Sequence, residues 1–348
     1  MNIYRDKRVL ITGHTGFKGA WLATMLQFLG ADVLGISKDI GQQKPLLAPN
    51  LTKGNDFDVD IRDKKLLRST IVSIKPDLVF HLAAQSLVLK SYQAPFETFE
   101  INLTGTLNIL ETCTEIDEVF GVVVVSTDKV YKNIESGRRF KEEDELGGID
   151  PYSASKSCTS ILVNSWRQVP GHDEKQFVDV RAGNVIGGGD RAQNRLMPDL
   201  INGALNNQTI LLRNPESVRP WQHVLDPLMG YLEVGQSILQ GKHLESSYNF
   251  GPSSLKALRV RDVAQIFKKH FSNIDFTYAN SSHLEKESKL LQLDSSLALK
   301  DFGWVSRISP EEAIDMTIHW ETAVHNFEES PLEATKKQIS QLFRPMQE

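Results

Sequence analysis

Two residues, Tyr152 and Lys156, stand four positions apart in a stretch that contains no helix-breaking residue. On a helix this spacing brings two side chains to the same face, one turn apart. The positive charge of a lysine beside a tyrosine lowers the pKa of the phenol, which can then act as a general base for a hydroxyl group near neutral pH. Because the same spacing often arises by chance, the hypothesis depends on what the rest of the chain places beside this pair.

A second polar segment, residues 126–129 (Ser-Thr-Asp-Lys), directly follows the most apolar run of the chain, residues 119–125. The run predicts a buried strand, and open α/β sheets bind their ligands at the carboxyl ends of such strands. The hydroxyl of Thr127 could therefore hydrogen-bond the same substrate oxygen as the tyrosine. Asp128 and Lys129 could instead cap the strand and form a surface ion pair.

Three glycines, Gly13, Gly16 and Gly19, stand three positions apart between a predicted strand over 8–12 and a predicted helix over 17–29. Glycines at this junction allow a tight turn, the approach of a pyrophosphate to backbone N–H groups, and close packing of the helix on the strand. The segment therefore predicts a dinucleotide-binding corner.

The end of the next predicted strand, residues 32–36, normally carries an acidic residue that binds the ribose hydroxyls of the adenosine. Here Ser37, Lys38 and Asp39 follow it. Asp39 could bind the ribose from a slightly late position, whereas Lys38 would tolerate a 2′-phosphate. This strand alone therefore does not decide between NAD and NADP.

Apolar strands alternate with helical patterns through the first half of the chain, and the strands are continuously apolar rather than alternating. Such strands are buried on both faces, as in a parallel sheet with helical crossovers. We predict strands over 32–36, 77–83, 119–125 and 177–181, and helices over 64–74, 96–113 and 152–167.

This alternation predicts a doubly wound α/β parallel sheet of the Rossmann type over residues 1–182. Residues 183–348 are expected to form mainly a smaller substrate-binding lobe, with about 224–250 returning to the first domain. The final polar stretch, 333–348, predicts a loose helix.

Composition excludes several classes of function. The 348 residues carry 39 Lys+Arg against 44 Asp+Glu, a formal net charge of -5, so the basic excess that nucleic acid binding uses is absent. The longest apolar run, 119–125, is too short to span a membrane, and no export signal is visible, which favours the cytoplasm. Cys113 and Cys158 cannot form a disulfide framework or a CxxC metal site, and no metal is expected.

Several longer strings add a resemblance to these patterns. The glycine corner, the strand-end hydroxyl and the Tyr/Lys pair resemble the extended short-chain dehydrogenase/reductase family. More narrowly, the sequence resembles the family of CDP-glucose 4,6-dehydratases from about residue 7 to residue 321. The strings are Gly-His-Thr-Gly-Phe-Lys-Gly at 13–19, Thr-Asp-Lys-Val-Tyr at 127–131, Leu-Gly-Gly-Ile-Asp-Pro-Tyr-Ser-Ala-Ser-Lys at 146–156, Arg-Ala-Gly-Asn-Val-Ile-Gly-Gly-Gly-Asp at 181–190 and Arg-Pro-Trp-Gln-His-Val at 219–224.

The resemblance implies a redox-neutral lyase reaction with bound NAD, in which CDP-glucose becomes CDP-4-keto-6-deoxyglucose with loss of water. Tyr152 would remove the proton of the C4 hydroxyl, and Asp128, held protonated in an apolar site, would act as the acid at C6. Lys129 occupies the place where dTDP-glucose dehydratases carry a glutamate base. It could take the C5 proton only if burial lowers its pKa, and could instead stabilise the enolate.

The predicted site falls into three groups of residues. The catalytic group is Thr127, Asp128, Lys129, Tyr152 and Lys156. The cofactor would contact Gly13, Thr15, Gly16, Phe17, Lys18, Gly19, Asp60, Ile61, Ala83 and Ala84 together with Tyr152 and Lys156, although Asp60 is equally well explained as a helix cap. The nucleotide sugar would contact Gln85, Ser86, Asn184, Arg191, Arg213, Arg219 and His223, the arginines being suited to its pyrophosphate. We expect His81 to be a satisfied buried histidine, and Trp221 and Trp304 to serve packing.

Two departures from the family pattern leave the substrate open. Arg191 stands where a tryptophan is common, and residues 134–139 lack the usual tryptophans, which leaves the hexose configuration and the nucleotide base undecided. Another nucleotide hexose, or a C4 epimerase reaction that needs only the Tyr/Lys pair, are the alternatives, and a non-catalytic dinucleotide sensor is a further one. The family also suggests a homodimer formed through helices beside the Tyr/Lys helix.

Overall fold

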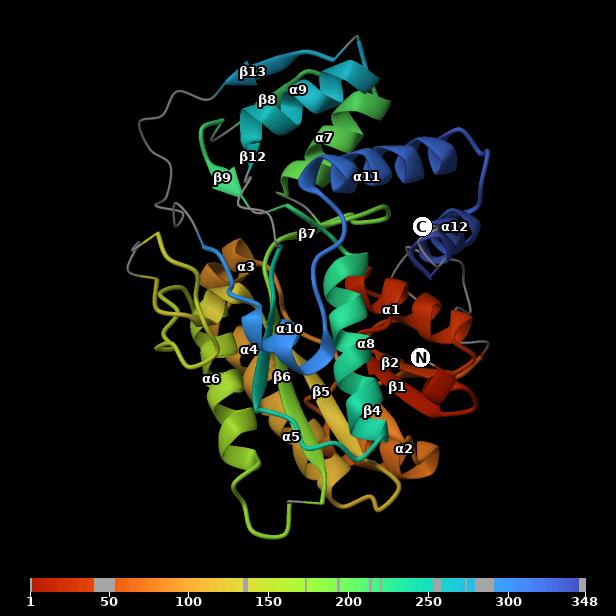
Figure 1. The fold of residues 1–348 in the computed structure, drawn as a ribbon, viewed down its shortest axis with the longest axis vertical. Coiled ribbons are helices and arrows are strands. Elements are labelled where there is room, and N and C mark those ends of the chain that lie inside the picture. Colours follow the sequence, from red (N-terminus) through yellow and green to blue (C-terminus); the bar gives the residue numbers. More distant parts are fainter. Residues whose placement is uncertain are drawn as a thin grey trace.

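A parallel sheet of seven strands forms the centre of the molecule (Figure 1). The computed structural model describes residues 2–40, 54–133, 137–172, 174–192, 195–212, 215–219, 221–252, 258–272, 274–278 and 291–343. The strand order is β11-β6-β5-β4-β1-β2-β3. The strands are β1 (Arg8–Thr12), β2 (Asp32–Ser37), β3 (Asp56–Asp58), β4 (Leu78–His81), β5 (Gly121–Val125), β6 (Gln176–Ala182) and β11 (Ser247–Phe250). The order reverses between β1 and β4, so the predicted doubly wound α/β fold is confirmed.

Helices cover both faces of this sheet. Neighbouring strand residues point to opposite sides, so a continuously apolar strand has an apolar surface on each face that a helix must cover. Val9 and Ile11 enter one apolar core, whereas Leu10 enters the other. The first core is closed by α1 (Phe17–Phe28), α8 (Leu225–Leu239), α10 (Ser296–Phe302) and α12 (Pro331–Phe343). The second is closed by α2 (Lys64–Ile74), α5 (Gly105–Thr114) and α6 (Pro151–Trp166), with α3 (Val88–Gln93) and α4 (Pro95–Phe99) packed beside α6.

A further group of elements, drawn at the top of Figure 1, has an apolar core of its own. Its helices are α7 (Leu196–Leu205), α9 (Val260–His270) and α11 (Pro310–His325). Its short strands pair as β7 (Val185–Ile186) with β10 (Gln222–His223), β8 (Ile210–Leu212) with β13 (Phe276–Tyr278), and β9 (Val218–Arg219) with β12 (Leu258–Arg259). Between these segments the chain returns to the sheet through α8 and β11.

Three details differ from the sequence-based expectation. The predicted helix over 96–113 is interrupted by a π-helical turn at Glu100–Thr104, which separates α4 from α5. The edge strand β3 and the short helix α3 lack a periodic apolar pattern and were not expected. The predicted C-terminal helix is confirmed as α12, but it is not loose: it packs against α1 and α11, and its Ile339 is fully buried.

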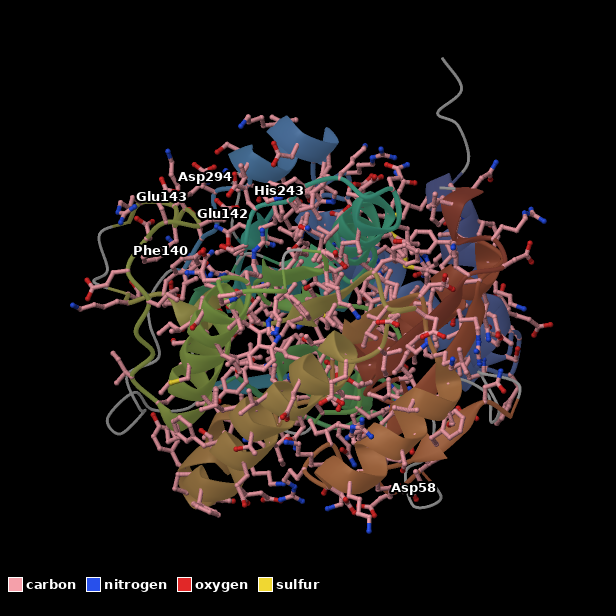
Figure 2. The ribbon with its side chains drawn as sticks, turned by 90° about the horizontal axis from the view of Figure 1, so that it is seen from below. Asp58, Phe140, Glu142, Glu143, His243 and Asp294 are labelled. Atoms are coloured by element: carbon pink, nitrogen blue, oxygen red, sulfur yellow. The ribbon has the colours of Figure 1, made fainter. Side chains whose placement is uncertain are left out.

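The two edges of the sheet lie at opposite sides of the molecule. Figure 2 places Asp58, the last residue of β3, far from Phe140 and Glu142. The latter two are fixed to the other edge, where the backbone N–H of Asn249 in β11 donates to Glu142 Oε1 at 2.7 Å. Among the described residues, no helix combines the length and the apolar character that a membrane span requires.

Candidate active site

The glycine corner between β1 and α1 is shaped by contacts that only glycine permits. Gly13 has a φ of +75°, and a Cβ there would meet the backbone nitrogen of Ala83 at 2.8 Å. A Cβ on Gly19 would meet the carbonyl oxygen of Gly13 at 2.2 Å, so this glycine lets α1 approach the turn. Gly16 is exposed, and a Cβ there would meet only the Gly13 carbonyl at 3.3 Å.

The amino terminus of α1 is suited to a pyrophosphate. Gly16 is the N-cap residue and offers no side chain to the first-turn N–H groups, so the amides of Phe17 and Lys18 remain available to an anion. The corner lies at the point where the strand order reverses, which is where doubly wound sheets bind dinucleotides. These residues therefore fit the dinucleotide that the sequence predicts.

Replacing Gly16 by alanine should weaken NAD binding roughly tenfold, about 1.4 kcal/mol, because the new methyl group would project toward the phosphates. The free protein should keep most of its thermal stability, since the Gly13 carbonyl oxygen, at 3.3 Å from the new Cβ, would have to move by only a few tenths of an ångström. Calorimetric titration with NAD and a thermal melt measure the two effects. The matched variant Gly19→Ala should lower the melting temperature instead, because its methyl group meets backbone; equal losses of stability in both variants would contradict this assignment.

At the end of β2, polar side chains surround the place where the adenosine is expected. The Ser37 hydroxyl and His14 Nδ1 lie 3.0 Å apart, and His14 Nε2 lies 2.8 Å from Asp56 Oδ1. Asp60 is paired with Arg62 at 2.6 Å and with Lys38 at 3.3 Å.

The hydrogen bonds from Arg62 lower the pKa of Asp60 to about 2. Asp60 is not a helix cap, which corrects that alternative: the N-cap of α2 is Asp63, whose carboxylate accepts from the Leu66 N–H. Ile61 is buried and fills the space above Gly105.

The predicted catalytic residues come from two neighbouring elements. Tyr152 and Lys156 lie on α6, whose start is fixed by Asp150, a capping residue that accepts from the Ser153 N–H. Thr127 and Asp128 follow β5 and begin a 3-10 turn, Asp128–Val130. All four are buried, with exposed fractions of 5–8%.

Hydrogen bonds connect these residues. The Thr127 hydroxyl donates to Asp128 Oδ1 at 3.0 Å, and it lies close enough to the Tyr152 phenol to affect the pKa of that group. Lys156 Nζ donates to the carbonyl oxygen of Val125, the last residue of β5, at 2.9 Å. The structure thus brings Thr127, Asp128, Tyr152 and Lys156 together, as the sequence predicts.

Burial dominates the electrostatics of this group. It raises the pKa of Tyr152 to about 12, with the Thr127 hydroxyl acting in the opposite direction, and it lowers the pKa of Lys156 to about 8. It also raises the pKa of Asp128, against the attraction of Lys129. The expectation that Lys156 lowers the pKa of Tyr152 is therefore not met in this arrangement, where the ammonium is directed to Val125.

Two residues that sequence reasoning missed, Tyr231 and Arg195, lie close to the predicted site. Lys18 Nζ lies 3.4 Å from the Tyr231 hydroxyl of α8, and burial lowers the pKa of Lys18 to about 8. The positive charge of Arg195, just before α7, also lowers the pKa of Lys18, whereas the negative charge of Asp128 raises it. Arg195 lowers the pKa of Tyr152 as well. The clustering of Arg191 and Arg195 in one loop was the available signal for the second cation.

Several predicted substrate residues are engaged by other side chains. The two terminal nitrogens of the Arg191 guanidinium donate to the carboxylate of Glu321, Nη2 at 2.7 Å, so a pyrophosphate would have to compete with an ion pair. The Gln85 amide donates to the Leu87 carbonyl in its own loop and to the Thr98 hydroxyl of α4.

His223 is fully buried beside Trp21, and burial lowers the pKa of its ring to about 3. Ser86 and Asn184, at the carboxyl ends of β4 and β6, are exposed. Arg213 and the side chain of Arg219 lie outside the described residues.

The structural roles expected for three side chains are confirmed. His81 is bonded at both ring nitrogens, to Thr12 at 2.6 Å and to Thr106 at 3.0 Å. The indole N–H groups of Trp221 and Trp304 donate to backbone carbonyls, and both rings are buried in apolar cores.

Residues 9–251 match the model of the NAD dependent epimerase/dehydratase family, which covers well over half of the sequence. The chain belongs to this family. NAD is accordingly the cofactor of this protein, as the resemblance implied.

Comparison with individual members shows which proteins of this family the chain resembles. The CDP-glucose 4,6-dehydratase of Salmonella typhimurium is 38% identical over 350 aligned positions, which cover 97% of each chain, so the resemblance to these dehydratases is confirmed. The UDP-glucose 4-epimerase of Thermus thermophilus, solved in complex with NAD, is 25% identical with a TM-score of 0.76 over 90% of this chain and 99% of that one. The dTDP-glucose 4,6-dehydratase DesIV of Streptomyces venezuelae, at 24% identity and a TM-score of 0.75 over 93% and 99%, shares the fold.

Proposed function

We propose that this protein is an NAD-dependent nucleotide-sugar 4,6-dehydratase that converts CDP-glucose to CDP-4-keto-6-deoxyglucose and water. The 38% identity to a CDP-glucose 4,6-dehydratase over nearly the whole chain supports the substrate. The observation that carries the reaction type is Asp128, a buried carboxyl group that accepts a hydrogen bond from the Thr127 hydroxyl close to Tyr152.

Tyr152 is the proposed general base for the C4 hydroxyl. Its phenol lies near the Thr127 hydroxyl, which donates to Asp128, so a sugar oxygen bound between phenol and hydroxyl would lie beside the acid as well. Bound NAD supplies the oxidation at C4 and the matching reduction at C6. Lys156, fixed by the Val125 carbonyl one helical turn from Tyr152, places a positive charge beneath the reacting group.

Asp128 is the proposed acid that protonates the departing C6 oxygen. Its raised pKa, caused by burial, favours the protonated form that this role requires. Lys129 is half-buried next to Asp128: as a neutral amine it would take the C5 proton when the C6 oxygen leaves and return it when hydride goes to C6, and as an ammonium it would stabilise the enolate. An epimerase needs no acid at C6, so a buried carboxyl at this place supports dehydration.

Incubation with CDP-glucose tests the proposal. A dehydratase gives a product lighter by one water, with a C6 methyl signal in the NMR spectrum. An epimer of unchanged mass would establish the C4 epimerase instead. A thermal-shift panel of nucleotide hexoses, run with the NAD-loaded protein, tests the base and the sugar, because the preferred ligand raises the apparent melting temperature most.

The substrate would lie between the sheet and the group of elements that contains α7 and α11. Residues 1–182 are proposed as the NAD-binding domain and 183–348 as mainly the substrate lobe, with 224–250 returning to the sheet as α8 and β11. Arg195 is proposed as a further cation for the pyrophosphate, since its positive charge is near enough to the site to lower the pKa of both Lys18 and Tyr152.

A homodimer is proposed through the helices beside the catalytic helix. Large apolar side chains are exposed there: Phe96 at 76%, Tyr92 at 55% and Ile161 at 55%. They lie on α4, α3 and α6, which pack against one another and lie side by side in Figure 1. Such a surface is typical of a subunit interface. The proposed location is the cytoplasm.

The variant Ile161→Glu should convert the dimer to a monomer, because a pair of like charges would be buried across a two-fold interface. Light scattering after size-exclusion chromatography measures the mass. The matched variant Val72→Glu, on exposed α2 at 39% exposure, should leave the mass unchanged. Equal masses for both variants would place the interface elsewhere.

A further inference from the structure

A buried carboxylate that the proposed reaction does not use lies beneath the catalytic helix. Asp179 of β6 is 1% exposed. Its Oδ2 accepts hydrogen bonds from the Ser160 hydroxyl and from Arg181 Nε, each at 2.7 Å. Its Oδ1 is buried and has no hydrogen-bond partner among the described residues. Such an arrangement is costly, so a buried carboxylate with a free oxygen calls for a role.

The position of Asp179 relates it directly to Lys156. In the sheet Asp179 is paired with Val124 of β5, and the next residue of that strand, Val125, supplies the carbonyl that binds Lys156 Nζ. Ser160 follows Lys156 by four residues on α6, hence on the same helix face one turn further on. The hydroxyl that holds Asp179 and the ammonium of the catalytic pair therefore face the same part of the sheet.

A second set of contacts, made by Arg181, holds Asp179 in place on the side away from α6. Arg181, on the same face of β6, also donates to the Tyr131 hydroxyl at 2.7 Å and to the Glu142 carbonyl at 3.2 Å. Tyr131 in turn donates to Asn249 Oδ1 at 2.8 Å. Figure 2 labels Glu142 at the edge of the molecule where this network ends. Asp179 is thus fixed on one side by the edge of the sheet and on the other by the catalytic helix.

We propose that Asp179 is a positioning residue for the Tyr/Lys pair: through Ser160 it fixes the catalytic face of α6, and it places a carboxylate against the same part of the sheet that the Lys156 ammonium faces. This inference rests on the proposed function in so far as Lys156 acts in catalysis. It assigns the buried pair of Asp179 and Arg181 a purpose beyond stability, since an ion pair in this setting adds little net stability.

The charges around Lys156 agree with this role. Burial lowers its pKa, and Asp179 is the group that opposes the effect. Lys18 from α1 is a further cation nearby, and His81 of β4 is kept neutral by burial and by Lys156 itself. The other titratable groups at the site are Tyr152 on α6, Asp128 and Lys129 after β5, Arg181 on β6, Tyr231 on α8 and Arg195 before α7.

The pKa of the Lys156 ammonium tests the proposal directly. It is followed by 15Nζ NMR of the NAD-loaded protein labelled at lysine, with the signal assigned by its loss in Lys156→Met. In Asp179→Asn the pKa should fall by at least about 0.5, because the nearby negative charge is removed. Ser160→Ala removes one hydrogen bond but keeps the charge, and Asp179→Glu keeps the charge as well, so both should leave this pKa near its original value.

The double variant Asp179→Asn/Arg181→Gln removes both members of the buried pair and leaves no unpaired guanidinium, so it answers the question if the single variant does not fold. An unchanged Lys156 pKa in whichever of the two variants folds, or an equal fall of this pKa in Ser160→Ala, would overturn the electrostatic role.

In a turnover assay the alkaline limb of the pH profile of kcat should move to lower pH in Asp179→Asn, since the Lys156 ammonium loses its proton at a lower pH. The NMR result needs no turnover, so a failure of the dehydratase assignment would remain distinguishable from a failure of this inference.

Discussion

Tyr152→Phe is expected to lower kcat for dehydration about a thousandfold, because no other group at the site is placed to take the C4 hydroxyl proton. Thr127 keeps its hydroxyl but is a poor base, and Lys156 is directed to the Val125 carbonyl. Phenylalanine fills the space of a side chain that is 8% exposed, so folding and NAD binding should be preserved. Steady-state turnover of CDP-glucose, a thermal melt and a titration with NAD measure the three quantities.

The control for this variant is a second buried tyrosine. Tyr248 lies on β11, away from the catalytic group, and its hydroxyl donates to Oδ2 of Asp301 on α10 at 2.9 Å. Tyr248→Phe should therefore leave kcat unchanged while losing two hydrogen bonds, one to Asp301 and one from the Glu245 N–H, at a cost of about 2 kcal/mol of stability. Full activity in Tyr152→Phe would remove the tyrosine from the mechanism, and equal losses in both variants would indicate a folding effect.

The sheet and the glycine corner were predictable because their causes are local. Continuous apolar runs such as 119–125 define buried parallel strands, and three glycines at one strand–helix junction define a turn that excludes side chains. The meeting of Thr127 with Tyr152 follows from the same rule, because the first stands at the end of a strand and the second on the helix that leads to the next one.

Contacts between distant segments were not predictable. Arg191 is bound by Glu321, which lies 130 residues further along the chain, and nothing near Arg191 indicates such a partner. The proximity of Arg195 and Tyr231 to Lys18 likewise depends on how α7 and α8 fold back over the sheet. The pKa of Tyr152 was misjudged for a related reason: sequence spacing gives the distance to Lys156, but desolvation depends on everything packed around both.

Asp128→Asn is expected to separate the two halves of the proposed reaction. The amide can still accept from the Thr127 hydroxyl, but it has no carboxyl proton to give to the departing C6 oxygen. Dehydration should fall about a hundredfold or more, whereas oxidation at C4 should continue. In a single turnover, reduced nicotinamide should accumulate and be visible in the near-ultraviolet absorbance. Loss of both halves together would mean that Asp128 serves the oxidation step instead of the elimination.

The same substitution should also make the folded protein more stable near neutral pH. Burial raises the pKa of Asp128 in the folded state above its unfolded value, so the folded state binds this proton more tightly. Its stabilising contribution is complete in acid, below the unfolded pKa, and is lost as the pH rises through the folded pKa. Asparagine removes this loss, so Asp128→Asn should melt a few degrees higher than the parent near neutral pH and at the same temperature in acid. Asp117→Asn, at an exposed carboxylate, should show no such difference. A higher melting temperature together with a lost elimination step would indicate that the buried acid is kept for chemistry at the expense of stability.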